Sequence, residues 1–210
     1  MTTTSPETDG RRARGARTRA QILERAANLA SVEGLDGLTI GRLATELGMS
    51  KSGLFAHFGS KEELQLATID AAREIFAREV VAPAREAERG LPRLEALLAA
   101  KLRYERGEVF EGGCFFETVR AEFDSRHPGP VRDAIEADLE EWDQLMRRVI
   151  RSAVKAGHLK PGTDVDQLQY EIEALSMTAT LRHQMTGDAT LFARAETAIA
   201  DRLAAARASG

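Results

Sequence analysis

The sequence TIGRLATELGMSKSGLFAHFGSK, from Thr39 to Lys61, predicts two short helices joined by a tight turn. In the first helix, Leu43 and Leu47 fall on one face at helical spacing, and Gly48 ends the helix. Ser50 stands where a helix N-cap is expected, with its hydroxyl placed to accept from free backbone N–H groups of the next turn. The stretch therefore indicates a helical hairpin whose second helix begins directly after Ser50.

The second helix has two different faces. Leu54 and Phe58 lie four residues apart and can pack back onto the first helix, which leaves Lys51, Ser52 and Gly53 facing outward. Small residues at the start of a helix allow close approach to base edges, and a lysine can reach a guanine edge or a phosphate. The pattern is typical of a DNA-reading helix-turn-helix. The alternative is an ordinary helical hairpin with a solvated polar face.

Composition favours an all-α protein. The chain has 210 residues, of which 43% are hydrophobic and 5% aromatic, with only 6 Pro. This is enough apolar material for a core. The chain contains no apolar run that could span a bilayer and no apolar secretory signal. The single Cys114 has no partner for an internal disulfide. We therefore expect a cytoplasmic protein.

Charge is unevenly distributed along the chain. The net charge is −4, yet the segment from Gly10 to Lys61 has nine basic and four acidic residues. A local basic patch suits phosphate neutralisation, and an acidic remainder discourages binding elsewhere. Residues 1–16 read as a disordered basic arm, because they are polar, rich in arginine and offer nothing to bury. The arm either touches DNA or only aids solubility.

Hydrophobic spacing and helix-breaking residues predict about nine helices. The helix that starts at Lys61 would link the N-terminal unit to the rest, so its tilt could transmit a signal. The predicted helices run from Thr18 to near Gly34, over the two already described, from Lys61 to about Val81 before a stop at Pro83, from Leu91 to Gly107, over Phe115 to Phe123, from Pro130 to Gly157, from Asp164 to Met185, and over Phe192 to Ala206.

The N-terminal unit resembles the DNA-binding domain of the TetR family of bacterial transcriptional regulators over roughly Arg17 to Leu66. Phe55 departs from the family pattern, which usually has a tyrosine that touches a phosphate, and Leu29-Ala30 replaces the more usual Leu-Phe. The motifs behind the resemblance are Thr18-Arg19, Leu38-Thr39-Ile40, Leu43-Ala44, Leu47-Gly48-Met49-Ser50, Leu54-Phe55, His57-Phe58 and Lys61-Glu62-Glu63-Leu64.

The resemblance implies a helix-turn-helix head over residues 17–62 and a helical ligand-binding and dimerisation domain over residues 63–210. It also implies operator DNA and a second copy of the chain as partners. Together with the exposed pattern of the second helix, it gives these DNA-binding candidates: Thr18, Arg19, Thr39, Ser50, Lys51, Ser52, Gly53, Phe55, His57 and Lys61.

For the last two helices the resemblance implies a four-helix bundle with their copies in the partner subunit. The alternative is that their apolar stripes are internal core. The candidate interface residues are Val165, Leu168, Ile172, Leu175, Ala179, Phe192, Ala195, Ile199 and Leu203.

A pocket for a small, largely apolar ligand is expected in the larger domain, since pockets are mostly apolar with a few polar groups. For each residue the alternative is ordinary core packing. The candidates are Tyr104, Phe115, Phe116, Arg120, Phe123, Trp142, Met146, Met177, Leu181 and His183.

Catalytic and metal motifs are missing from the sequence. Cys114 has no nearby partner residue, and His57, His127, His158 and His183 lack the spacing of a zinc site. We predict no cofactor, no metal and no enzyme activity. The predicted function is a homodimeric repressor that its ligand releases from DNA. The alternatives are a helical carrier of apolar ligands that does not bind DNA, and a helical enzyme that uses Cys114 or a His/Asp pair.

Overall fold

The computed structural model describes residues 6–124 and 128–208, and most of these residues are helical. They include no β-strand, which confirms the all-α prediction. When directly continuous helical segments are counted together, this part of the chain has nine helices, as predicted.

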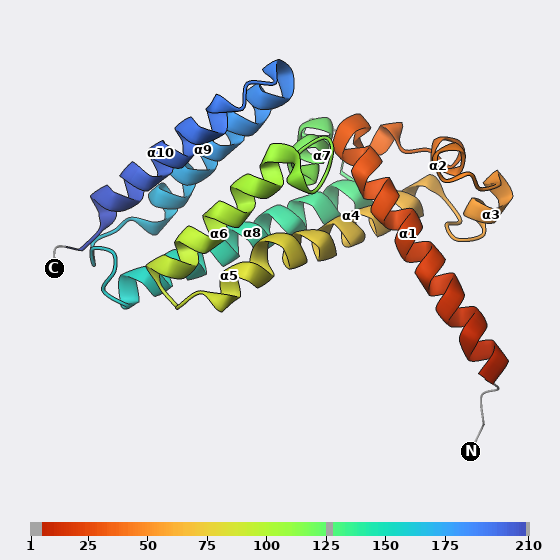
Figure 1. The fold of residues 1–210 in the computed structure, drawn as a ribbon, viewed down its shortest axis with the longest axis horizontal. Helices are drawn as coiled ribbons and strands as arrows, with labels where there is room; N and C mark the ends of the chain where they lie inside the picture. Colours follow the sequence, from red (N-terminus) through yellow and green to blue (C-terminus); the bar gives the residue numbers. More distant parts are fainter. Residues whose placement is uncertain (1–5, 125–127, 209–210) are drawn as a thin grey trace.

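Three helices form the N-terminal head: α1 Pro6–Gly37, α2 Ile40–Leu47 and α3 Lys51–Phe55. The prediction of a disordered arm over residues 1–16 is wrong from Pro6 onward, and residues 1–5 lie outside the described part. Alanine and arginine are strong helix formers, so helix α1 starts early. Its first half projects away from the other helices (Figure 1).

The head has a small apolar core of its own. Leu43 of α2, Leu54 of α3 and Phe58 are completely buried, together with Ile22 and Ala26 of α1. Residues four apart on α1 thus pack against the hairpin of α2 and α3. This packing confirms the predicted inner faces of both helices.

The helix that starts at Lys61 does not stop at Pro83. Helix α4 Lys61–Phe76 continues into a π-helical segment, η1 Ala77–Val81, and then into α5 Ala82–Glu86. The π-helical turn has its hydrogen-bond partner five residues back, and Pro83 falls in the first turn of α5, where a missing N–H is tolerated. The predicted break is therefore wrong because the sequence does not reveal the π-helical turn.

The body contains the remaining helices. In Figure 1, α4, α6 and α8 run along one another, α7 lies against α1, and α9 and α10 form a pair at the outer edge. Their starts at Leu91, Phe115 and Pro130 agree with the predicted ones. The segments are α6 Leu91–Arg103, η2 Tyr104–Glu108 (π-helical), α7 Phe115–Phe123, α8 Pro130–Lys155, α9 Val165–Thr186 and α10 Thr190–Ala206.

The apolar stripe predicted as the subunit interface lies inside the chain. Its side chains pack α9 and α10 against each other and against the body. This is expected because the apolar face of an amphipathic helix turns toward the core of its own domain. Val165 and Leu175 are half-buried. The prediction is corrected for the buried members, which a second subunit cannot cover: Leu168, Ile172, Ala179, Phe192, Ala195, Ile199 and Leu203.

Candidate DNA-binding and ligand-binding sites

The turn between α2 and α3 is held by local hydrogen bonds. Thr39 Oγ1 accepts from the backbone N–H of Arg42 at 3.1 Å and caps the start of α2. Gly48 ends α2 in the left-handed conformation, with a φ of 63°. Ser50 Oγ accepts from the backbone N–H of Gly53 at 3.1 Å and caps α3. These bonds confirm the predicted helix boundaries.

Helix α3 presents one buried and one exposed face. Leu54 is buried in the head, whereas Lys51 and Ser52 are exposed at the start of the helix. Phe55 lies at its end with 54% of its surface exposed. The exposed face is therefore small, basic and partly aromatic, and contacts between it and DNA stay predictions.

Gly53, His57 and Arg19 have roles within the head. A Cβ at Gly53 would lie 3.0 Å from Ser50 Oγ, so glycine leaves room for the cap. The half-buried His57 accepts at its carbonyl oxygen from Arg19 Nη1 at 3.2 Å, and the Arg19 guanidinium lies 4.3 Å from the centre of the Phe58 ring. Arg19 therefore docks α1 against the end of α3.

Thr18 and Lys61 also use their polar groups within the head. Thr18 Oγ1 donates to the carbonyl of Arg14 at 3.0 Å. Lys61 Nζ donates to the carbonyl of Asp36 at 2.9 Å and lies 3.2 Å from its carboxylate. Both side chains of this ion pair are more than 40% exposed, and such pairs stabilise little.

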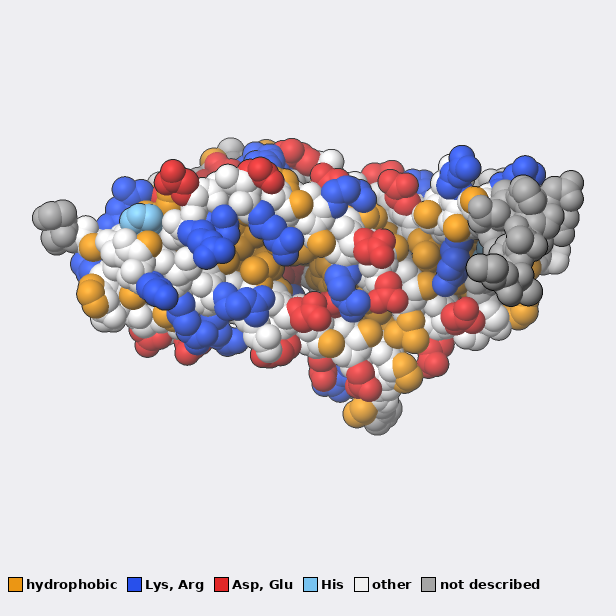
Figure 2. All heavy atoms as spheres, turned by 90° about the horizontal axis from the view of Figure 1, so that it is seen from below, with side chains coloured by type: hydrophobic (Ala, Val, Ile, Leu, Met, Phe, Trp, Pro, Cys, Tyr) orange, Lys and Arg blue, Asp and Glu red, His pale blue; other side chains and the backbone are white. Residues whose placement is uncertain are grey.

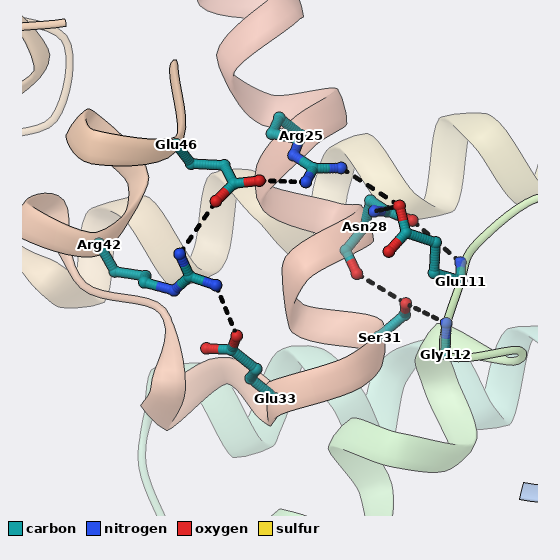
Figure 3. A network of polar contacts seen from close by, with 8 residues as sticks. All are labelled: Arg25, Asn28, Ser31, Glu33, Arg42, Glu46, Glu111 and Gly112. Atoms are coloured by element: carbon teal, nitrogen blue, oxygen red, sulfur yellow. Dashed lines mark hydrogen bonds and ion pairs between the residues drawn. The ribbon is translucent and has the colours of Figure 1, made fainter. Parts of the chain in front are cut away.

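A polar network joins the head to the body (Figure 3). Arg25 of α1 pairs with Glu46 of α2 and, at 3.4 Å, with Glu111 in the loop before α7. Arg42 of α2 pairs with Glu46 at 2.9 Å and with Glu33 of α1 at 3.0 Å. The hydrogen bond from Arg25 lowers the pKa of Glu46, so Glu46 stays charged near neutral pH.

The backbone of the loop before α7 packs directly against the backbone of α1. Gly112 donates its N–H to Ser31 Oγ at 3.1 Å (Figure 3). A Cβ at Gly112 would lie 2.0 Å from the Ser31 carbonyl oxygen, so only glycine fits. On the other side, Gln184 Nε2 of α9 donates to the Gly112 carbonyl at 2.6 Å. The loop is therefore clamped between the head and α9.

Helix α7 contacts the head along one face. The Glu122 carboxylate accepts from the backbone N–H groups of Leu35 at 2.6 Å and Asp36 at 2.8 Å, in the last turn of α1. Thr118 Oγ1 donates to the Ser31 carbonyl at 3.0 Å. On its opposite face, α7 lines a cavity with Phe116, Glu117 and Arg120.

The cavity has a volume of about 440 Å³ and lies in the body, against α4, η1, α5, α6, α7, α8 and α9. On the face drawn in Figure 2, a hollow with hydrophobic side chains has several Lys and Arg side chains along part of its rim, and Asp and Glu side chains along another part. The lining combines apolar and charged groups and includes Phe76, Val81, Phe116, Ile135, Leu139, Trp142, Leu145, Arg73, Arg85, Lys101, Glu117, Arg120, Asp138, Glu141, Arg148 and Glu173.

Only three of the predicted pocket residues line this cavity: Phe116, Arg120 and Trp142. The prediction is corrected for Met177 and Leu181, which are 46% and 59% exposed on the outer face of α9. The others lie elsewhere: Tyr104, Phe115 and Met146 are buried in the core, Phe123 is half-buried at the end of α7, and His183 packs on the Phe192 ring at 5.1 Å.

A buried lysine that we did not predict lies at the cavity. Lys101 Nζ donates to Glu105 and to Ser176 Oγ at 2.9 Å, and lies 3.5 Å from Glu173. Burial alone would lower the pKa of Lys101, but Glu105 and Glu173 outweigh it and hold that pKa above its usual value. Trp142 Nε1 donates to Glu173 at 2.6 Å. The sequence did contain a signal for this buried pair. Lys101 and Glu105 lie four residues apart and continue the spacing of the inward-facing leucines of the same helix.

The chain matches the models of two protein-family domains. Residues 22–68 match "Bacterial regulatory proteins, tetR family", and residues 90–199, more than half of the chain, match "Tetracyclin repressor-like, C-terminal domain". The chain belongs to the TetR family. It is therefore a DNA-binding transcriptional regulator that also binds a ligand.

Solved structures of similar chains agree with this TetR-family assignment. A TetR regulator from Chloroflexus aurantiacus is 26% identical, with a TM-score of 0.85, and covers 94% of this chain and 100% of its own. One from Cytophaga hutchinsonii is 22% identical, with a TM-score of 0.80 and coverages of 92% and 96%. AibR, solved with isovaleryl coenzyme A and operator DNA, is 20% identical, with a TM-score of 0.68 and coverages of 87% and 97%. No curated protein matches the chain.

Cys114 of this TetR-family chain is poorly suited to catalysis. Burial, with Glu105 and Glu117 nearby, raises the pKa of its thiol to about 12, and a protonated thiol is a weak nucleophile. The three side chains could bring metal-ligand atoms within 4.8 Å of one another, but Lys101 already pairs with Glu105. TetR-family regulators are typically not enzymes. Among the described residues, no helix is long and apolar enough to cross a bilayer.

Proposed function

We propose that this TetR-family chain is a homodimeric repressor that acts in the cytoplasm. Residues 17–62 bind the operator, and residues 63–210 dimerise and bind a small, largely apolar ligand that releases the DNA. The observation that supports this most is the exposed basic face of a firmly capped α3, within the segment that matches the family's DNA-binding domain. AibR, with the same fold, was solved with both operator DNA and a small ligand.

The DNA-reading surface lies where α2 and α3 begin. A Cβ at Gly41 would lie 3.3 Å from Lys51 Cε, so the Lys51 side chain passes over the start of α2. In a major groove, Lys51 would reach a guanine edge or a phosphate, and the exposed Phe55 ring would contact a thymine methyl group. Two-fold symmetry would place the two α3 helices about 34–36 Å apart, one turn of DNA.

The dimer surface is the outer face of α9 and α10, opposite the buried stripe. Four large apolar side chains are exposed along α9 at helical spacing, which is unusual for a surface that stays in water. The exposed face of α10 has small side chains that allow close approach of another helix. The α9 residues are Tyr170, Met177, Leu181 and Met185, and the α10 residues are Ala193, Thr197, Ala200 and Ala204.

Shortening Leu181 should weaken both the dimer and DNA binding. Losing the burial of this side chain costs about 2 kcal/mol in each subunit, and a two-fold dimer loses it twice, so the Kd of dimerisation should rise roughly a thousandfold. We expect wild type to sediment as a dimer and to shift DNA that flanks its own gene, and Leu181→Ala to need higher protein concentrations for both. Val32→Ala is the control, since Val32 is 56% exposed on α1.

Two results would count against the proposal. If wild type shifts the flanking DNA no better than unrelated DNA of equal length, the chain does not act there as an operator-binding repressor. If Leu181→Ala and Val32→Ala dimerise equally well, the interface lies elsewhere.

Helix α7 and the preceding loop are the proposed link between ligand and DNA. One face of α7 lines the cavity and the other holds α1, including its last turn. A ligand that shifts α7 would therefore move the head directly. The coupling between two such sites is typically about 1–3 kcal/mol.

Gly112→Ala should loosen the head from the body. The added Cβ cannot coexist with the Ser31 carbonyl, and relieving such a clash costs about 1–3 kcal/mol. We expect faster hydrogen exchange at the amides of Leu35 and Asp36, measured by mass spectrometry. Gly162→Ala is the matched control, because its Cβ would meet nothing within 4 Å. Equal exchange in both variants would show that the loop is not the link.

A further inference from the structure

We propose that the cavity takes an anionic amphiphile: a ligand with a carboxylate or phosphate head held by Arg85 and Arg148, and an apolar tail among Phe76, Phe116 and Trp142. This inference rests on the proposed function, because it names the class of ligand that would release the DNA.

Arg85 and Arg148 are the positive groups of the lining that are left for a ligand. Within residues 6–124 and 128–208 neither side chain forms an ion pair, and both are exposed. They come from two different elements, α5 and α8, and both line the cavity. An anion in this cavity can meet two guanidinium groups, each of which offers several fixed N–H donors to carboxylate or phosphate oxygens.

Most other charges of the lining are already balanced inside the chain. Arg73 bonds Asp138 at 2.5 Å, and Glu141 adds to the negative field around that arginine. Arg120 lies 3.5 Å from Glu117. Lys101 pairs with Glu105 and Glu173, which also line or border the cavity. Glu117, Asp138 and Glu173 therefore have cations beside them, whereas Glu141 is exposed and forms no ion pair within residues 6–124 and 128–208.

The interior between these pairs is aromatic. Phe76 meets Phe116 edge-to-face with ring centres 5.8 Å apart, and meets Trp142 in the same way at 5.3 Å. Leu139 and Leu145 of α8 extend this surface. An alkyl tail buried there should bind about fourfold more tightly for each CH₂ group that it gains.

The π-helical segment η1 runs along the cavity. Ala77 and Val81 of η1 and Arg85 of α5 all line the cavity at four-residue spacing, and π-helical turns often occur at functional sites. In Figure 2, several Lys and Arg side chains stand at one part of the rim of a hollow that contains hydrophobic side chains.

Three probes with the same tail separate the ligand classes: decanoate, decanol and decyltrimethylammonium. Trp142 is the only tryptophan of the chain and lines the cavity, so its fluorescence reports occupancy. We expect decanoate to bind at least tenfold more tightly than the other two. In Arg85→Gln/Arg148→Gln this advantage should disappear, since bonds to a charged group are each worth about tenfold in affinity.

The control is Arg89→Gln/Arg151→Gln, which removes two exposed arginines that do not line the cavity and should leave all three affinities unchanged. Equal affinities for the probes, tighter binding of the cation, or no fluorescence change with any of them overturns the proposal.

A gel shift on the same samples keeps the two proposals apart. If the chain binds the DNA that flanks its gene but binds decanoate no more tightly than the other probes, the proposed ligand class is wrong and the proposed function as a DNA-binding regulator is kept. If decanoate binds as expected but the flanking DNA does not, the proposed function fails instead.

Discussion

Lys51→Ala should lower operator affinity by about 2–6 kcal/mol for the dimer. Removing one side chain that contacts a base edge costs about 1–3 kcal/mol, and a two-fold dimer loses the contact twice. Lys51 is the first residue of α3 and is exposed, and its cap at Ser50 does not depend on its side chain. The fold should therefore survive the change.

The measurement is a gel shift at fixed salt, repeated over a range of salt concentrations. If Lys51 contacts a phosphate, the salt dependence of binding should also become shallower. Lys155→Ala removes an exposed lysine at the end of α8 and should change neither quantity. Equal losses in the two variants would mean that only overall charge matters and that α3 does not read the operator.

Lys101→Met should destabilise the body by about 3–5 kcal/mol. The Lys101 side chain is 6% exposed and that of Glu105 is fully buried, so removing the lysine leaves a buried carboxylate without its counter-charge. The change also removes the bond from Lys101 to Ser176, which ties α6 to α9. Urea unfolding followed by circular dichroism gives the free energy of unfolding.

The double variant Lys101→Met/Glu105→Leu tests the cause. Replacing both members of a buried pair by apolar residues is often neutral, so most of the lost stability should return. If the double variant is as unstable as the single one, the loss comes from packing or from the Ser176 contact, and the buried pair is not the reason.

Local features were predictable because they depend on residues close together in the chain. The caps at Thr39 and Ser50 and the helix stop at Gly48 involve partners within five residues. The same holds for the start of α8 at Pro130. Pro83 is the exception, since the preceding π-helical turn removes the conflict that normally ends a helix there.

The binding sites were less predictable. An apolar stripe shows that a helix face will be buried, but not which neighbour buries it. On α9 the stripe with Leu168 and Ile172 packs inside the chain, and Met177 and Leu181, predicted for the pocket, lie on the exposed face. Likewise Arg19 and Lys61 were predicted as DNA contacts from their positions, and only the structure shows that they have partners within the chain at His57 and Asp36.

Hydrophobic periodicity, capping residues and the basic segment up to Lys61 were enough to establish an all-α chain with a helix-turn-helix at its N-terminus, because those signals act over a few turns of helix. The charge balance of the cavity, the clamp at Gly112 and the exposed face of α9 came only from tertiary packing. They depend on pairs such as Arg73 with Asp138, 65 residues apart, and no local pattern specifies which distant side chains will meet.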